Sequence, residues 1–185
     1  MMVYNLTSTW YVLFGGGSRT SMRIGIASFL LERALDDPSA IIDRLVQFGR
    51  EVENHSFGGI WVGDAMGRGE PTLDPMLALA LLCSVTSRSG LGISVLQAPL
   101  RQPVELAHQA QTLDVLSKGR FRLRVGAGST RSDFALVGAD FKRRFETLGV
   151  SVDTMRRAWR GEPLNCVVLM PWRSNRTDMT NNSLP

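Results

Sequence analysis

The 185-residue sequence is poor in cysteine, lysine and histidine, and it has no long hydrophobic run. Its two cysteines, Cys83 and Cys166, lie far apart and form no C-x-x-C motif, so neither a disulfide scaffold nor a cysteine metal site is expected. The longest apolar stretch, Met76 to Val85, falls short of the ~20 apolar residues that cross a membrane. Neither histidine, His55 or His108, belongs to an H-E-x-x-H motif. These absences predict a protein without a metal site, a membrane span or an oxidising compartment, and cytoplasm is the expected location.

The positive charge comes almost entirely from arginine. The chain has 21 Lys and Arg against 17 Asp and Glu, a net charge of +4, and only Lys118 and Lys142 are lysines. About half of this excess lies outside residues 22–163. No basic run with interleaved aromatic side chains occurs, which is the usual footprint of a nucleic-acid site. The charge pattern therefore predicts no nucleic-acid partner, and a nucleic-acid binder is the least favoured hypothesis.

Strand and helix patterns alternate along the regular part of the chain. Short apolar runs predict strands, and apolar residues at alternating spacings of three and four predict helices. The expected strands span residues 22–29, 58–63, 91–96 and 121–125, and the expected helices start near residues 39, 74, 106 and 145. Four strand-helix units in strict alternation predict an α/β fold with parallel strands and right-handed crossovers.

In parallel α/β folds the functional groups gather at the carboxyl ends of the strands. This rule nominates Asp64, the segment Ser94 to Ala98 and the segment Gly126 to Thr130. The glycines and hydroxyls of the last segment suit a phosphate group, but they equally suit a strand-to-loop turn. Asp64 is the single carboxylate expected at this edge, and a weak candidate for catalysis, with a capping or turn role as the alternative. Both histidines fall outside the strand ends, so we expect solvated or capping roles for them.

Two arginines are expected to point inward from the fourth strand. Arg122 and Arg124 alternate with apolar residues, and both share their parity with Gly126. A buried guanidinium needs an acid or an anion, so a structural ion pair is the first hypothesis and a cofactor phosphate the second.

Several segments resemble one family of barrel enzymes. They are IWVGD at 60–64, LDPMLALALL at 73–82, TSRSGLGISVL at 86–96, PLRQPVELAHQAQTLDVLSKGRF at 99–121 and VGAG at 125–128, followed by GADF at 138–141 and WRGEP at 159–163. In order and spacing they resemble the luciferase-like monooxygenase family. The resemblance implies a partial TIM (β/α)8 barrel with about four parallel βα units, which binds FMN or the deazaflavin F420 at the carboxyl ends of the strands.

The resemblance also nominates cofactor-binding residues. Ser94 and Val95 match the position where the family often has a non-prolyl cis peptide that supports the flavin. The strand-four segment beside the flavin matches Gly126, Ala127 and Gly128, and the neighbouring hydroxyls are those of Ser129 and Thr130.

This sequence departs from the family at two positions. Ala65 follows Asp64 where the family often has histidine, and Ala127 stands where the luciferases carry an arginine associated with the flavin phosphate. Arg124 or Arg131 is a candidate to take over that phosphate.

The resemblance implies a flavin-dependent oxidoreductase, a monooxygenase in the first instance, acting on a small-molecule substrate. A complete barrel takes roughly 250 residues, and residues 22–163 hold only half of one. We therefore expect a leader outside the fold at residues 1–21, a luciferase-like half barrel at 22–163 and a poorly ordered tail at 164–185. The alternative is a chain inactive through truncation, either a non-catalytic fragment or a companion subunit that pairs with a complete barrel. Either way, a dimer partner is expected to cover the open barrel edges.

Overall fold

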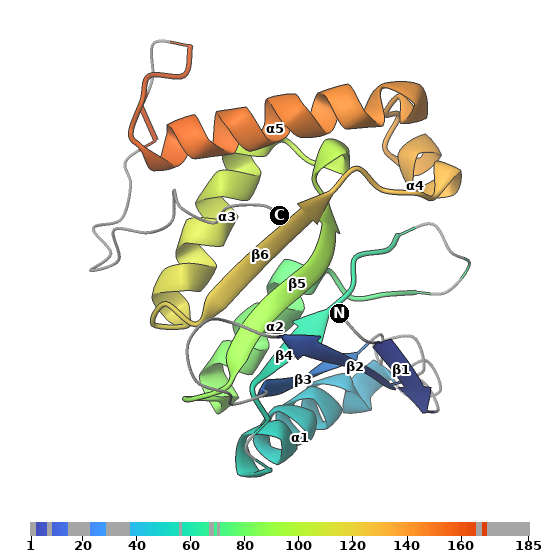
Figure 1. Ribbon diagram of the computed structural model, residues 1–185, viewed down its shortest axis with the longest axis vertical. Coiled ribbons are helices and arrows are strands. Elements are labelled where there is room, and N and C mark those ends of the chain that lie inside the picture. The colour runs from blue at the N-terminus through green and yellow to red at the C-terminus, as the bar shows by residue number, and fades with distance from the viewer. Residues whose placement is uncertain are drawn as a thin grey trace.

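The computed structural model describes residues 3–6, 9–14, 23–28, 38–55, 57–66, 69, 71–165 and 168–169. One six-stranded sheet, with its strands in sequence order, forms the centre of the described chain (Figure 1). The strands are β1 Val3–Leu6, β2 Thr9–Phe14, β3 Arg23–Ser28, β4 Gly59–Val62, β5 Gly90–Gln97 and β6 Phe121–Gly126. The α-helices are α1 Ile41–Asn54, α2 Pro75–Val85, α3 Pro103–Leu116, α4 Arg131–Leu136 and α5 Arg144–Trp159. Short 3-10 helices lie at η2 Pro38–Ala40, η3 Ala98–Leu100 and η4 Phe141–Arg143.

The four strands from β3 to β6 run parallel, which confirms the predicted α/β fold. The expected helices are present as α1, α2, α3 and α5, and they pack side by side in that order. Helix α2 starts where the sequence predicts, with Pro75 in its first turn. The Asp74 carboxylate caps this helix: it accepts hydrogen bonds from the backbone N–H groups of Met76 at 2.8 Å and Leu77 at 3.1 Å. No helix among the described residues is long and apolar enough to cross a membrane.

Apolar side chains of the parallel strands and of the helices form one core. Its fully buried members include Ile60, Leu79, Leu91, Ile93 and Leu106. The opposite face of the sheet carries Trp61, whose ring lies so close to Gly92 that a Cβ at this glycine would overlap it. The Arg124 guanidinium lies over the same ring, 4.7 Å from its centroid.

The sheet continues into the segment that the sequence predicts as a leader. β2 pairs antiparallel with the whole of β3, from Thr9 opposite Ser28 to Phe14 opposite Arg23, and β1 pairs antiparallel with β2. The pairing has a physical reason: β3 would otherwise present an open hydrogen-bonding edge, and an extended apolar segment can satisfy it. The domain boundary at Met22 stays a prediction. Most of the predicted tail, residues 164–185, lies outside the described residues.

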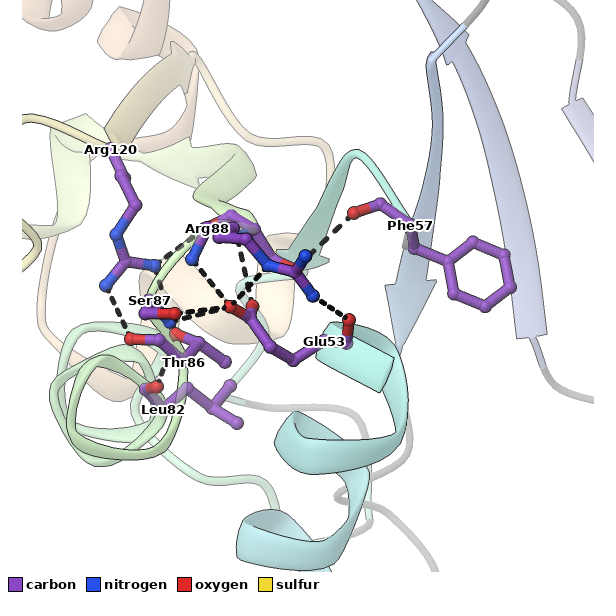
Figure 2. Close-up of polar contacts among 8 residues, drawn as sticks. Glu53, Phe57, Leu82, Thr86, Ser87, Arg88 and Arg120 are labelled. Carbon is purple, nitrogen blue, oxygen red and sulfur yellow. Dashed lines mark hydrogen bonds and ion pairs between the residues drawn. The ribbon is translucent and has the colours of Figure 1, made fainter. Parts of the chain in front are cut away.

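At the amino end of β5, the carboxylate of Glu53 binds the loop between α2 and β5 (Figure 2). Its Oε1 accepts hydrogen bonds from Ser87 N at 3.0 Å, Ser87 Oγ at 2.7 Å and Arg88 N at 2.7 Å, and its Oε2 accepts one from Ser89 N at 3.0 Å. Burial raises the pKa of the Glu53 carboxyl, but the hydrogen bonds from Ser87 and Ser89 outweigh it and hold the pKa well below its usual value of 4.5. The end of α1 is thereby fixed to the start of β5.

Arg120 holds the same loop from the other side (Figure 2). Its Nη1 donates to Thr86 Oγ1 at 3.0 Å and to the Ser89 carbonyl at 2.7 Å, and its Nη2 donates to the Thr86 carbonyl at 3.0 Å. Its Nε donates to the Ser117 carbonyl at 2.8 Å. The loop between α2 and β5 therefore lies between a carboxylate from α1 and a guanidinium that precedes β6.

We predict that Glu53→Gln lowers the free energy of unfolding at neutral pH by about 2 kcal/mol, because the amide cannot accept all the hydrogen bonds that the carboxylate accepts. A carboxyl whose folded pKa is depressed stabilises the folded protein above its unfolded pKa, and this contribution is lost as pH falls. The difference between wild type and Glu53→Gln should therefore be constant above about pH 5 and shrink as pH falls below 4.5. Urea unfolding between pH 3 and 8 measures it.

A second variant, Ser87→Ala, removes only the hydroxyl donor and should give a smaller effect of the same sign. If the difference in free energy of unfolding between wild type and Glu53→Gln stayed constant down to pH 3, this account would be contradicted.

Candidate functional site

The carboxyl ends of the parallel strands bring three sequence-distant segments to one edge of the sheet. Asp64 follows β4, Gln97 ends β5, and Gly126 to Thr130 leads from β6 into α4. Gln97 lies directly opposite Gly126 in the β5–β6 register. The structure thus brings together the strand ends that the sequence nominates.

Asp64 is buried and forms a bidentate ion pair with Arg101. Its side chain is 1% exposed, and its Oδ2 and Oδ1 accept hydrogen bonds from Arg101 Nη1 at 2.6 Å and Nη2 at 2.8 Å. Burial lowers the pKa of the Arg101 guanidinium, but the hydrogen bonds and charge of Asp64 outweigh it, so the net shift of the pKa is upward. Arg101 Nη2 also lies 3.5 Å from Asp74 Oδ2, which links the pair to the start of α2.

Gln97 connects this ion pair to α4. Its backbone N–H donates to Asp64 Oδ2 at 2.8 Å, and its side-chain Nε2 donates to the Asp64 carbonyl at 3.2 Å and to Asp133 Oδ2 at 2.7 Å. Gln97 is 3% exposed and Asp133 is 0% exposed, so the whole connection is buried. The Asp64 carboxylate thus has hydrogen-bond donors on both oxygens.

The Ser94–Val95 peptide bond is cis, as the family resemblance implies. The β5–β6 register shifts at this point, between Ile93 and Leu96. Val95 is 46% exposed, and a Cβ placed on Gly126 would lie 3.2 Å from its Cγ2. The missing side chain at Gly126 therefore leaves an exposed surface made of Val95 and glycine backbone.

The loop after β6 contains the other nominated residues. Ala127 is buried, Ser129 is exposed and Thr130 is partly exposed. Gly128 adopts a φ of +79°, and a Cβ there would lie 2.5 Å from Gln97 Oε1 and 3.0 Å from Phe134 Cε2. Glycine is required at this position by its backbone conformation and by the closeness of both neighbours.

The arginines expected to point inward contact an aromatic ring and backbone carbonyls. Arg124 lies over the Trp61 ring, and burial lowers the pKa of its guanidinium. Arg122 Nη1 donates to the backbone carbonyls of Gly119 at 3.0 Å and Phe121 at 2.7 Å. An aromatic face and backbone carbonyls can each receive a guanidinium, and the choice between an ion pair and a cofactor phosphate stays a prediction.

The two histidines lie away from the strand ends. His55 caps the end of α1, where its backbone N–H donates to the Glu51 carbonyl and its ring Nδ1 lies 2.9 Å from the same oxygen. His108 is exposed on α3 and lines an open groove of about 540 Å³ on that helix. Among the described residues, no group of three or more His, Cys, Asp and Glu side chains is arranged to hold a metal ion.

Sequence reasoning missed three residues of the buried polar network at this edge, Gln97, Arg101 and Asp133. Gln97 falls inside the nominated segment Ser94 to Ala98, and a glutamine at the end of an apolar strand is the signal that singles it out. Arg101 and Asp133 have no such signal, because their partners lie more than 30 positions away along the chain. Asp133 also belongs to α4, whose six residues are too few to show a helical period.

The sequence profile of one family, described as luciferase-like monooxygenase, matches residues 22–167. Among curated proteins, 4-hydroxyprotoasukamycin monooxygenase of Streptomyces nodosus subsp. asukaensis is 32% identical over 143 residues, which are 76% of this chain and 38% of the relative. The F420-dependent glucose-6-phosphate dehydrogenase of Amycolatopsis mediterranei is 32% identical over 130 residues, which are 65% of this chain and 39% of the relative.

A solved structure shares the fold. It is the oxygenating constituent of 3,6-diketocamphane monooxygenase from the CAM plasmid of Pseudomonas putida, in complex with FMN, with a TM-score of 0.71 and 19% sequence identity. The match covers 78% of this chain and 41% of that one, so the chain spans about two fifths of the length of the relatives it matches. The α/β fold described above is therefore consistent with part of a TIM barrel, and the chain belongs to the luciferase-like monooxygenase family.

Proposed function

We propose that this chain binds a flavin, FMN or F420, across the carboxyl ends of β5 and β6 and acts as an oxidoreductase of the monooxygenase type. The observation that carries the proposal is the exposed side chain of Val95 beside Gly126, an apolar surface at the edge where this fold binds ligands. Both cofactors occur among the proteins that this chain resembles, which supports naming FMN and F420: one solved structure holds FMN, and one curated relative is F420-dependent.

The residues present fit a flat ring system. A side chain at Gly126 would lie against Val95 and cover the exposed surface, and none is there. Backbone at Gly126 and Gly128 can approach a ligand closely, and the hydroxyls of Ser129 and Thr130 stand next to it in the chain. These residues, with Ser94 and Ala127, are the proposed cofactor contacts.

The bound flavin would supply the redox chemistry, and the protein would bind it, orient it and control access of a small-molecule substrate. We infer a positioning role for Asp64, because Arg101 and the Gln97 N–H occupy both carboxylate oxygens. Arg124 and Arg131 are the proposed candidates for the flavin phosphate; Arg131 lies 4.6 Å from the centroid of the Phe141 ring. A cytoplasmic location remains part of the proposal.

A second candidate is a non-catalytic companion or truncated chain that pairs with a complete barrel. It is favoured by β6, which lies at the end of the strand order in the described sheet and is partly exposed from Arg122 to Gly126. An edge strand with unpaired backbone groups can accept a further strand. A dimer partner at this edge is proposed on the same ground.

We predict that the purified chain binds FMN or F420, measured by titration of the cofactor fluorescence. Gly126→Val should weaken this binding at least about tenfold, because the added branched side chain covers the surface beside Val95. Gly149→Ala is the matched control: nothing lies within 4 Å of its added Cβ on α5, so binding should be unchanged.

One result would contradict flavin binding, and a second one would favour the companion function. A wild-type chain that binds neither cofactor would contradict a flavin-binding function. If that chain also forms a stable heterodimer with a full-length relative in gel filtration and pull-down, the companion function is favoured instead.

We predict that Arg101→Met lowers the free energy of unfolding by about 3–5 kcal/mol, because it leaves the buried Asp64 carboxylate without its counter-charge. Urea unfolding measures the change. Arg143→Met is the matched control, since Arg143 and its partner Glu146 are 66% and 61% exposed and the midpoint should barely move. Equal effects of the two substitutions would show that the Asp64–Arg101 pair does not hold the strand ends together.

A further inference from the structure

We propose that Gln97 is a positioning residue for the cofactor, whose buried side-chain amide fixes the loop from Gly126 to Thr130 against the Asp64–Arg101 pair. This inference rests on the proposed flavin site. Gln97 touches the loop from inside the protein, so its effect on the cofactor would pass through Gly126 and Gly128.

The first observation concerns the two hydrogen bonds that the side-chain amide of Gln97 donates. Nε2 donates to the Asp64 carbonyl, in the segment after β4, and to the Asp133 carboxylate in the first turn of α4, the helix that follows the loop. The backbone of Gln97 pairs with Gly126 in the sheet. The residue therefore contacts the strand before the loop and the helix after it.

The second observation is an unpaired acceptor. Gln97 Oε1 is buried, and it has no hydrogen-bond partner among the described residues. It points at Gly128, because a Cβ added there would lie 2.5 Å from it. The oxygen thus lies directly against the glycine backbone that the proposal assigns to the cofactor.

These two observations distinguish Gln97 from a residue that merely fills space. A buried acceptor without a partner destabilises the folded protein, and an apolar side chain of the same shape would avoid that cost. The amide stabilises the structure through its two donated bonds: one ties Gln97 to the segment after β4, and the other ties it to α4, the helix that follows the loop. Local features that break the rules of a well-packed core are expected at functional positions.

Gln97 is a neutral residue in contact with two acidic residues. Asp64 and Asp133 both face Gln97, and Arg101 is paired with Asp64. Nε2 donates to the Asp133 carboxylate, so replacing it with an acceptor would turn an attraction into a repulsion. A glutamine is therefore suited to this position, where a glutamate is not.

The experiment compares Gln97→Leu with Gln111→Leu, which replaces another buried glutamine, on α3. We expect Gln97→Leu to weaken FMN binding about tenfold and to speed amide hydrogen exchange in residues 126–134 of the cofactor-free protein. Gln111→Leu should leave both unchanged. Thermal unfolding of each variant measures the accompanying loss of stability.

Gln97→Glu tests the donor itself. Burial and the neighbouring Asp64 and Asp133 should raise the pKa of the introduced carboxyl, so that it becomes protonated at mildly acidic pH and regains an O–H donor. We expect the ratio of its FMN dissociation constant to that of wild type to fall as pH is lowered from 8 to 5. A residue that only fills space would give a constant ratio.

The outcomes separate this inference from the proposed function. Wild-type binding of FMN with equal binding by Gln97→Leu would overturn the inference alone. Wild type that binds neither FMN nor F420 would overturn the proposed function, and with it the role of Gln97 toward a cofactor. A Gln97→Glu variant that matches Gln97→Leu at every pH would overturn the requirement for a donor.

Discussion

The buried ion pair of Asp64 and Arg101 is the contact on which the carboxyl edge of the sheet depends. Removing two charges from water is costly, and the cost is offset only where the geometry is good and the remaining hydrogen-bonding capacity is used. Both conditions hold here, because the guanidinium meets the carboxylate with two nitrogens and the Gln97 N–H provides a further donor. The ends of β4 and β5 and the start of α2 therefore have one common anchor.

β5 is held by polar contacts at both of its ends. At its start, Glu53 and Arg120 bind the loop that precedes it, and at its end Gln97 and Asp64 bind one another. The apolar core fixes the middle of the strand. Because Ser94 and Val95 lie between these fixed points, the surface proposed for the flavin belongs to a rigid element, which is what precise positioning of a cofactor requires.

The sequence predicts the periodic elements well and the polar contacts poorly, for physical reasons. Four parallel strands and their helices follow from local apolar patterns, and a carboxylate at Asp64 follows from its place after β4. Its partner Arg101 depends on how a loop returns across the sheet, which no local pattern records. Arg124 illustrates the same limit: its inward direction follows from strand parity, but its contact with Trp61 depends on a neighbouring strand. The pairing of β2 with β3 likewise depends on an edge that only the assembled sheet presents.

The face of the sheet opposite the helices carries the side chains of Trp61 and Arg124. In a closed barrel, inward side chains from opposite strands fill this space in layers. In the described chain the Trp61 ring lies so close to Gly92 that no side chain fits there, and the Arg124 guanidinium lies over the same ring. Toward the carboxyl ends, Val95 is 46% exposed beside Gly126, and Gln97 lies against Gly128 in the loop that follows. The flavin that we propose to bind there would therefore lie next to the buried contacts of Asp64, Arg101 and Gln97.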